Sequence, residues 1–485
     1  MRRWGLALAV AAAVVAVAGA QAIVSLTHVS SDPFDNATSQ HATELEPDTF
    51  AWGNTIVGAY QVGRFFNGGA TDIGFATSSD GGSTWTSGDL PGLTYSSGAA
   101  QPYQRVSDAS VAYDARHNVW LISSIPLLPS TTVPTVFVSR STDGGLTWAN
   151  PVNIPPPVSN SIDLDKNWTA CDNTPTSPFY GHCYTELDNF GDGDLELMST
   201  STDGGLTWST PIRTDGNDKG LGGQPVIQPG GRVIVPFESL NGAIEVFYSD
   251  NGGASWSRGS KAGKIHFHTV AGGLRTSPLP TAEIAGDGTV YVAWEDCSFR
   301  KSCSSNDIVF VSSPDGVNWS DVTRVPIDPV TSGVDHFIPG LAVDRATAGP
   351  TTHLALTYYY YPDAACAGGC QMDVGFITSP DGGAHWSDPV QLAGPMSLSD
   401  IALTSQGSMV GDYMSTSFNA SGAATALFAV GNPHTGTTFD EAMYAPAAPL
   451  AVASLAASPN ASTTAGAAQV TGNGTGDAIQ ATKND

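Results

Sequence analysis

Three arginines stand out as residues that could bind an acidic ligand. The chain has only 19 Lys and Arg against 45 Asp and Glu, a formal net charge of −26, so each arginine is conspicuous. Arg105, Arg275 and Arg300 are the best candidates, because a planar guanidinium matches a carboxylate with two hydrogen bonds. An arginine near an Asp, as Arg105 is to Asp108, is also typical of a structural ion pair. The arginines therefore indicate either a carboxylate clamp or ion pairs that stabilise the fold.

Carboxylates, a tyrosine, a tryptophan and a histidine complete the candidate site. Carboxyl groups serve as general acids and bases, and a tyrosine becomes a nucleophile only beside a base. Trp168 offers an aromatic face to a sugar, and His268 is either a base or a loop histidine held by hydrogen bonds. The candidates for catalysis are Asp108, Glu238, Glu283 and Tyr413. Further polar residues of the predicted inner strands, to which the sequence assigns no role, include Glu46, Lys166 and Asp412.

An eight-residue motif that recurs six times predicts the elements that position these residues. The copies resemble Ser-x-Asp-Gly-Gly-x-x-Trp and occupy 78–85, 141–148, 201–208, 249–256, 312–319 and 379–386. A short motif at long, similar spacing indicates one repeated structural unit. Short strands with turn signals precede each copy, and a Pro-Val or Pro-Ile run often follows it. Four short antiparallel strands per unit predict a β-propeller blade, with the motif as the turn between the third and fourth strands.

These motifs resemble the Asp-boxes of the BNR/sialidase-like β-propellers, and the resemblance covers nearly all of the predicted folded part. It implies an all-β propeller of four-stranded antiparallel blades, with the boxes on the face opposite the active site. The box positions, which are then structural, are Asp80, Asp143, Asp203, Asn251, Asp315 and Asp381. The resemblance also implies a sugar carboxylate bound by Arg105, Arg275 and Arg300, Asp108 as acid/base, and Tyr413 as a nucleophile activated by Glu283 or Glu238.

The ring of blades needs a unit that has no box. Six boxed units run from about 41 to 395, and three further strands without a box follow between 410 and 444. Residues 23–29 form a strand with no unit of its own. Joined to the three C-terminal strands, this strand would complete a blade and close the ring without free edges. We therefore predict seven blades, with six as the alternative.

The two ends of the chain and the cysteines predict an exported protein. Residues 1–22 read as a secretory signal peptide, 23–445 as the propeller, and 446–485 as a disordered low-complexity tail. The six cysteines form three close pairs, and an even number in an exported chain favours local disulfides over zinc. The pairs are Cys171 with Cys183, Cys297 with Cys303, and Cys366 with Cys370.

We expect no cofactor and no metal. Asp188, Asp192 and Asp194 suggest structural calcium through their oxygen atoms, but they lack the alternating ligand register, so a solvated Gly-rich turn is the preferred interpretation. The strong negative charge argues against nucleic acid and anionic membranes as partners. We expect a secreted monomer whose partner is an extracellular glycan or polysaccharide.

Three functions from different classes fit these observations. The first is a sialidase-like glycoside hydrolase, of the exo-alpha-sialidase type, acting on an acidic extracellular glycan. The second is a lyase or hydrolase acting on a uronate-containing polysaccharide. The third is a non-catalytic glycan-binding or adhesion propeller, which is favoured because the early Phe/Tyr-Arg-Ile-Pro motif of sialidases is absent and only Gly63-Arg64-Phe65-Phe66 comes near it.

Overall fold

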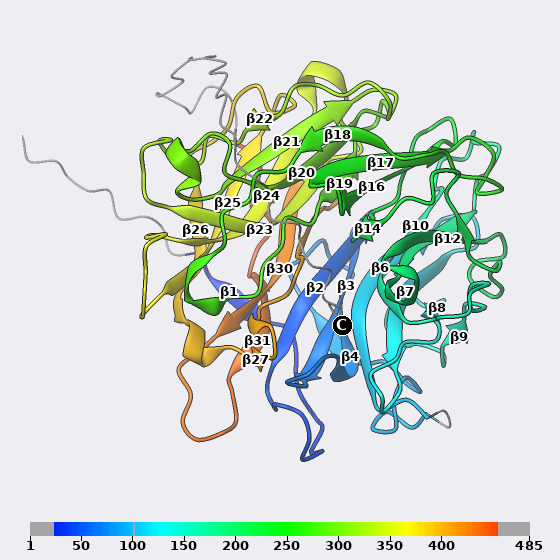
Figure 1. Cartoon of the computed structure of the whole chain (residues 1–485), viewed down its shortest axis with the longest axis horizontal. Helices are drawn as coiled ribbons and strands as arrows, with labels where there is room; N and C mark the ends of the chain where they lie inside the picture. Colours follow the sequence, from blue (N-terminus) through cyan, green and yellow to red (C-terminus); the bar gives the residue numbers. More distant parts are fainter. Residues whose placement is uncertain (1–23, 100–101, 454–485) are drawn as a thin grey trace, which may run out of the picture.

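Antiparallel strands make up almost all of the regular structure in the computed structural model, which describes residues 24–99 and 102–453 (Figure 1). Within these residues the helical elements are short 3₁₀ turns: η1 (Phe190–Asp192), η2 (Ala271–Gly273), η3 (Lys301–Cys303), η4 (Gly349–Thr351) and η5 (Leu398–Asp400). None of the described helices has the length and apolar character needed to cross a membrane. The predicted signal peptide and residues 454–485 of the predicted tail lie outside the described residues.

Most strands belong to four-stranded antiparallel sheets that follow one another along the chain. The first two groups, which share only the residue pair Ala70–Val106, are β2 (Glu44–Trp52), β3 (Thr55–Arg64), β4 (Ala70–Ser78) and β5 (Thr86–Asp89), then β6 (Arg105–Asp114), β7 (Val119–Leu127), β8 (Phe137–Ser141) and β9 (Val152–Asn153). Next come β10 (Leu164–Cys171), β11 (Cys183–Asn189), β12 (Leu195–Ser201) and β13 (Ile212–Arg213), then β14 (Gly220–Leu221), β15 (Val226–Ile227), β16 (Val233–Ser239), β17 (Ala243–Ser249) and β18 (Ser260–Lys264). The following sheets are β19 (Thr281–Ile284), β20 (Val290–Asp296), β21 (Asp307–Ser313) and β22 (Thr323–Arg324), then β23 (Asp335–Val343), β24 (Leu354–Tyr361), β25 (Gln371–Ser379) and β26 (Val390–Ser397).

The last sheet joins the two ends of the described chain. It contains β29 (Ser415–Phe418), β30 (Ala423–Gly431) and β31 (Glu441–Pro446), and β1 (Leu26–His28) pairs antiparallel with β31, as the sequence predicted (Figure 1). The short strand β32 (Leu450–Ala451) also pairs with β30. Residues 446–453 therefore belong to the fold, contrary to their assignment to a disordered tail, because they add backbone hydrogen bonds to this sheet. A separate hairpin, β27 (Leu403–Thr404) with β28 (Gly407–Ser408), precedes the sheet.

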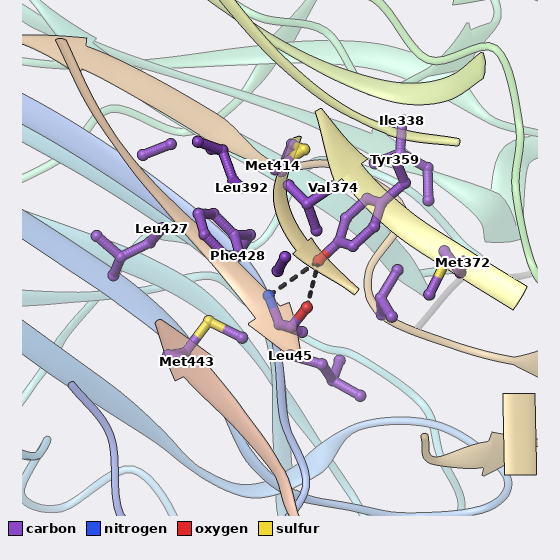
Figure 2. Packing of buried hydrophobic residues seen from close by; sticks show 14 of the residues in the cluster. Leu45, Ile338, Tyr359, Met372, Val374, Leu392, Met414, Leu427, Phe428 and Met443 are labelled. Carbon is purple, nitrogen blue, oxygen red and sulfur yellow. Dashed lines mark hydrogen bonds between the residues drawn. The ribbon is translucent and has the colours of Figure 1, made fainter. Parts of the chain in front are cut away.

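The first strands of successive sheets pack side by side. β2 contacts β6, β6 contacts β10, β10 and β19 both contact β15, β19 contacts β23, and β29 contacts both β23 and β2. Buried apolar clusters fill the spaces between neighbouring sheets, because strands covered on both sides carry apolar residues on both faces. The largest of these clusters unites the chain ends, with Leu45 of β2, Tyr359 of β24, and Phe428 and Met443 of β30 and β31 (Figure 2). There the Tyr359 hydroxyl donates to the Ala429 carbonyl (3.0 Å) and accepts from the Ala429 N–H (2.9 Å).

The six repeated motifs are turns between the third and fourth strands of their sheets. In the second copy, the Asp143 carboxylate accepts hydrogen bonds from the Ser141 hydroxyl (2.8 Å), the Thr147 N–H (3.0 Å) and the Thr147 hydroxyl (2.6 Å). Equivalent bonds form at Asp80, Asp203, Asn251, Asp315 and Asp381. The two variant copies keep the turn, since the amide oxygen of Asn251 accepts as a carboxylate does and Asp315 closes a turn that is one residue shorter.

Three disulfides connect the predicted pairs Cys171–Cys183, Cys297–Cys303 and Cys366–Cys370. Each closes a short loop, and the first also links the paired strands β10 and β11, where the two cysteines lie directly opposite each other.

Candidate functional site

Three neighbouring inner strands each contain a β-bulge that turns a polar side chain in the same direction. The strand pairing shifts register between Leu45 and Asp48 in β2, between Ser107 and Ser110 in β6, and between Asp165 and Asn167 in β10. At these bulges Glu46, Asp108 and Lys166 have φ values of 59°, 50° and 40°. Left-handed backbone is uncommon outside glycine, and bulges often redirect a side chain beside a functional site.

The redirected side chains meet around one buried lysine. Lys166 Nζ lies 2.8 Å from Asp412 Oδ2, 3.2 Å from Asp108 Oδ2 and 3.7 Å from Glu46 Oε1, and its side chain is only 3% exposed. Arg275 binds Asp412 from another side with two hydrogen bonds, Nε to Oδ1 at 2.7 Å and Nη2 to Oδ2 at 2.5 Å. We call these five residues the Lys166 cluster.

Neighbouring polar groups fix the orientation of the Lys166 cluster. The Gln61 amide donates to Glu46 and also to the Ser107 hydroxyl (3.1 Å), while its oxygen accepts from Arg64 Nη1 (2.6 Å). The Ser107 hydroxyl donates to Asp108 Oδ1 (2.6 Å), and Asn167 Nδ2 donates to the Asp108 carbonyl (2.6 Å). A network of this kind restricts the rotamers of the carboxylates and rigidifies the site.

Burial and nearby charge drive the pKa values of the clustered carboxyl groups apart. Burial raises the pKa of Glu46 to about 7, although Lys166 opposes the shift. Burial, and then the negative charge of Asp412, raise the pKa of Glu238 to about 7. Burial would raise the pKa of Asp412 as well, but Arg275 and Lys166 hold it below its usual range. A carboxyl that keeps its proton near neutral pH thus lies close to one that stays ionised, which is the arrangement of acid–base catalysts.

Tyr413 and Trp168 cover the Lys166 cluster on one side. Their rings meet edge to face with centroids 5.1 Å apart, and Lys166 Nζ lies 5.5 Å from the centre of the Tyr413 ring. The Tyr413 hydroxyl donates to the Ala109 carbonyl (3.1 Å), and burial, then the charge of Glu46, raise its pKa well above the usual value. A cavity of about 10 Å³ lies beside these rings, and its lining includes Lys166, Trp168, Glu186, Gln224 and Tyr413. That volume has room for about one water molecule.

Several of the predicted site residues do come together. Asp108 and Arg275 belong to the Lys166 cluster, and Tyr413 and Trp168 border it. Glu238 is influenced by the cluster because the charge of Asp412 adds to the effect of burial in raising the pKa of Glu238. Arg275 is engaged by Asp412, so the structure places it in an ion pair inside the site.

Four predicted residues lie apart from the Lys166 cluster. Arg105 Nη1 donates to Asn67 Oδ1 (2.8 Å) and to the Gly68 carbonyl (3.0 Å). Arg300 forms buried ion pairs with Asp307 (2.5 Å) and Asp328 (2.6 Å).

His268 and Glu283 are the other two. His268 Nδ1 is 2.9 Å from the Cys303 carbonyl, as a hydrogen-bonded loop histidine would be. Glu283 lies in β19 and lines a different cavity, where its Oε2 is 3.5 Å from Arg345 Nη2. These contacts give the three arginines separate protein partners, and the structure does not bring them together as one clamp.

The sequence had assigned no role to Glu46, Lys166 or Asp412, which form the core of the site. A register shift and a left-handed residue leave no clear pattern in a strand sequence. The available signal is the charge of these residues on or beside the inner strands, with Glu46 in β2, Lys166 in β10, and Asp412 in the run Val410-Gly411-Asp412-Tyr413 that precedes β29.

A second group of buried carboxyl groups crosses the β10–β13 sheet. Asp165, Asp188 and Glu196 lie directly opposite one another on three strands, and Glu186 shares their face because it is two residues from Asp188. We call these four residues the carboxylate ladder; all are fully buried. Burial, and then the charge of Asp188, raise the pKa of Glu186 well above its usual value.

The three aspartates considered as calcium ligands differ in their exposure. Asp188 and Asp194 are buried, whereas Asp192 is exposed and accepts a hydrogen bond from Asn189 Nδ2 (3.0 Å). Among the described residues, the group with a spacing suited to a metal ion is Asp307, Asp328 and His336. Its two carboxylates already pair with Arg300 and Arg324, which argues against a cation there.

Comparison with known proteins gives distant similarity. No protein-family model matches the chain. A curated sialidase of Bacteroides fragilis (strain YCH46) is 23% identical over 309 residues, which cover 56% of this chain and 53% of the relative. The chain thus spans about half the length of the curated relative it matches.

Three similar solved structures have low sequence identity to this chain and TM-scores below 0.5. A protein of unknown function from Dyadobacter fermentans is 16% identical with a TM-score of 0.47, covering 74% of this chain and 99% of its own. The intramolecular trans-sialidase of Ruminococcus gnavus is 15% identical with a TM-score of 0.40, covering 82% and 92%. An ulvan lyase of polysaccharide lyase family PL25, bound to -[GlcA(1-4)Rha3S]-, is 11% identical with a TM-score of 0.49, covering 87% and 95%.

Proposed function

We propose that the protein is an exported seven-bladed propeller of the sialidase-like type that hydrolyses glycosidic bonds of an extracellular glycan at the Lys166 cluster. Seven blades are supported by the six boxed sheets, by the sheet in which β1 pairs with β31, and by the contacts between the first strands of neighbouring sheets. Export is supported by three disulfides, which persist in oxidising compartments. The partial match to a sialidase supports the choice of a glycan as substrate.

The observation that carries the proposal is the convergence of three carboxylates, from Glu46, Asp108 and Asp412, on one buried lysine and one arginine in the Lys166 cluster. Glu46 and Glu238, with pKa values of about 7, are able to give a proton to the leaving oxygen of a glycosidic bond. Asp412, which Arg275 and Lys166 keep ionised, supplies negative charge that stabilises the oxocarbenium-like transition state. We assign no nucleophilic attack to Tyr413, because its hydroxyl donates to a backbone carbonyl and burial disfavours the phenolate.

The decisive experiment is a product assay on three substrate classes. Purified mature protein is incubated with a sialoside, a uronate-containing polymer and neutral oligosaccharides, and products are detected by mass spectrometry. We expect hydrolysis of at least one class, loss of most activity in Glu238→Gln and in Asp412→Asn, and a rate that falls as pH rises through about 7, where Glu46 and Glu238 lose their protons.

The matched control is Glu245→Gln, which changes a partly exposed glutamate of β17 outside the Lys166 cluster and should keep full activity. Unsaturated, ultraviolet-absorbing ends from the uronate polymer would identify a lyase instead. Absence of turnover with all three classes would refute the proposal.

A second function, non-catalytic glycan binding, is favoured by the closed state of this site. The cavity beside Tyr413 holds about one water molecule, and the predicted arginines have protein partners. A glycan array that shows binding of a glycan which the protein does not cleave would favour this function.

A further inference from the structure

A cavity of about 390 Å³ lies at the other end of the inner strands. β2 begins beside the Lys166 cluster, at Glu44, and ends at Trp52; β29 likewise follows Asp412 and ends at Phe418. The cavity is lined by the final residues of β2, β23 and β29 and by the turns that follow them. It therefore opens on the mouth of the inner strands opposite the Lys166 cluster, and its volume falls in the range of small-ligand sites.

One wall of this cavity is aromatic and held in place by the fold. Trp52 is 40% exposed although it is large and apolar, and its ring lies 5.4 Å from that of the buried Tyr113. Phe50 and Phe418 are half-buried in the same lining. The Arg345 guanidinium lies over the Phe50 ring at 4.8 Å from its centroid. The wall thus offers flat apolar surface beside a fixed hydrogen-bond donor.

The opposite part of the lining is polar and carries both donors and acceptors. Arg345 Nη2 lies 3.5 Å from Glu283 Oε2, and Asp344 and Asn419 also line the cavity. Arg345 donates only and the carboxylate of Glu283 accepts only, so together they match a group that does both. The lining contains the carboxylates of Glu283 and Asp344 but only one guanidinium, which makes it unfavourable for an anionic ligand.

Hydrogen bonds between the segments that line the cavity preform it before any ligand arrives. The Thr49 hydroxyl bonds to that of Ser417 (2.8 Å), and this contact joins β2 to β29. The Ala420 N–H donates to the Gly53 carbonyl (2.9 Å), which joins the turns after the same two strands. A preformed site loses less conformational entropy on binding.

We propose that this cavity is a second binding site, which takes a neutral pyranose ring of a glycan and is not catalytic. A pyranose has an apolar C–H face that fits the exposed surface of Trp52. Its adjacent hydroxyl groups donate and accept, as the Glu283–Arg345 pair requires. The site lies on the face of the box turns, away from the Lys166 cluster, so it would hold a glycan chain independently of any cleavage. The inference does not depend on the proposed hydrolysis.

Calorimetric titration with neutral hexasaccharides tests the proposal. The probes are cellohexaose, maltohexaose, mannohexaose and xylohexaose, added to the mature protein and to five variants. We expect millimolar or tighter binding of at least one probe, at least tenfold weaker binding in Trp52→Ala and Arg345→Ala, and partial retention in Trp52→Phe, which keeps an aromatic face and reports on correct folding. Tyr95→Ala is the matched control, because Tyr95 is a 57% exposed aromatic residue outside the cavity lining.

Binding should also leave the opposite mouth unaffected. Glu238→Gln is expected to bind the same probe with unchanged affinity, whereas loss of affinity in Glu238→Gln with normal affinity in Trp52→Ala would place the ligand at the Lys166 cluster and overturn the inference. Failure of all four probes to bind would overturn it as well. Because cleavage is not measured, a failed hydrolysis assay leaves this result unaffected.

Discussion

Replacing Lys166 with methionine is expected to destabilise the protein, and more so at alkaline pH. Methionine keeps most of the length and apolar volume of lysine but removes its charge. Lys166 Nζ is within 3.7 Å of three carboxylates, from Asp412, Asp108 and Glu46, and the side chain is buried. After the substitution Arg275 is the remaining cation of the Lys166 cluster. Removing one partner of a buried ion pair leaves an uncompensated charge, which costs about 3–5 kcal/mol.

The pH dependence of this destabilisation follows from the ionisation of Glu46. Its folded-state pKa is raised from 4.5 to about 7, so its ionisation opposes folding, and the penalty grows from about pH 4.5 to about pH 7. The size of this penalty in the wild type is about 3 kcal/mol at 1.36 kcal/mol per pKa unit. Loss of Lys166 raises the pKa of Glu46 further, since Lys166 is the main group that lowers it. Each additional unit adds about 1.4 kcal/mol of destabilisation at alkaline pH and none at pH 4.

Urea denaturation followed by tryptophan fluorescence at pH 5 and pH 8 measures both effects. For Lys166→Met we expect a loss of about 3–5 kcal/mol at pH 8 and a loss at least about 1 kcal/mol smaller at pH 5. Lys264→Met, at an exposed position of β18, is the control and should change stability little at either pH. Equal destabilisation at the two pH values, or a loss below about 1 kcal/mol at pH 8, would show that Lys166 does not neutralise buried carboxylates.

Three other predictions test the carboxylate ladder, a disulfide and a box turn. Glu186→Gln should raise the free energy of unfolding at pH 8 and leave it unchanged at pH 4, because the raised pKa of Glu186 makes its ionisation unfavourable to folding. Urea denaturation curves that show no gain in the free energy of unfolding at pH 8 would contradict this. The double variant Cys171→Ser/Cys183→Ser should lose about 2–4 kcal/mol, and reductant should lower its stability less than that of the wild type, because only the disulfides Cys297–Cys303 and Cys366–Cys370 remain to be reduced. Asp143→Ala should lower the melting temperature at pH 7 but not at pH 2. Hydrogen bonds, first from the Thr147 hydroxyl, lower the pKa of Asp143 to about 2, so the stability that they provide is lost as the pH falls from about 4. Equal shifts of the melting temperature at both pH values would argue against this role of the carboxylate.

The sequence predicted the features that depend on short-range chemistry. The box turns were readable because Asp143 bonds only to residues within four positions of it in the chain. The disulfide pairs were readable for the same reason, since the cysteines of each pair are 12, 6 and 4 residues apart. The pairing of β1 with β31 was predictable because a lone N-terminal strand and an incomplete C-terminal sheet each lack a partner.

The candidate site was less predictable because its contacts join distant segments. Lys166 and Asp412 are 246 residues apart, and Arg275 and Asp412 are 137 residues apart. Arg300 looked like a ligand clamp from its sequence position, but the structure pairs it with Asp307 at the start of β21 and with Asp328. Glu283 was placed with the catalytic candidates, although its strand position brings it to the opposite mouth. Residue type predicted which groups could do chemistry, and the three-dimensional arrangement decided which of them meet.

The bulges suggest how a repeated sheet acquires a single site. A register shift with a left-handed residue also occurs in β23, between Phe337 and Gly340, where Ile338 has a φ of 49°. There the residue is apolar, and its N–H donates to Glu295 Oε2 (2.7 Å). The bulge therefore recurs as a backbone feature, whereas the side chain at that position differs between sheets. Glu46, Asp108 and Lys166 occupy the bulge position in three neighbouring sheets, so charged side chains gather at the Lys166 cluster. A change of residue at the bulge position therefore alters the chemistry of the site while the strand pairing remains.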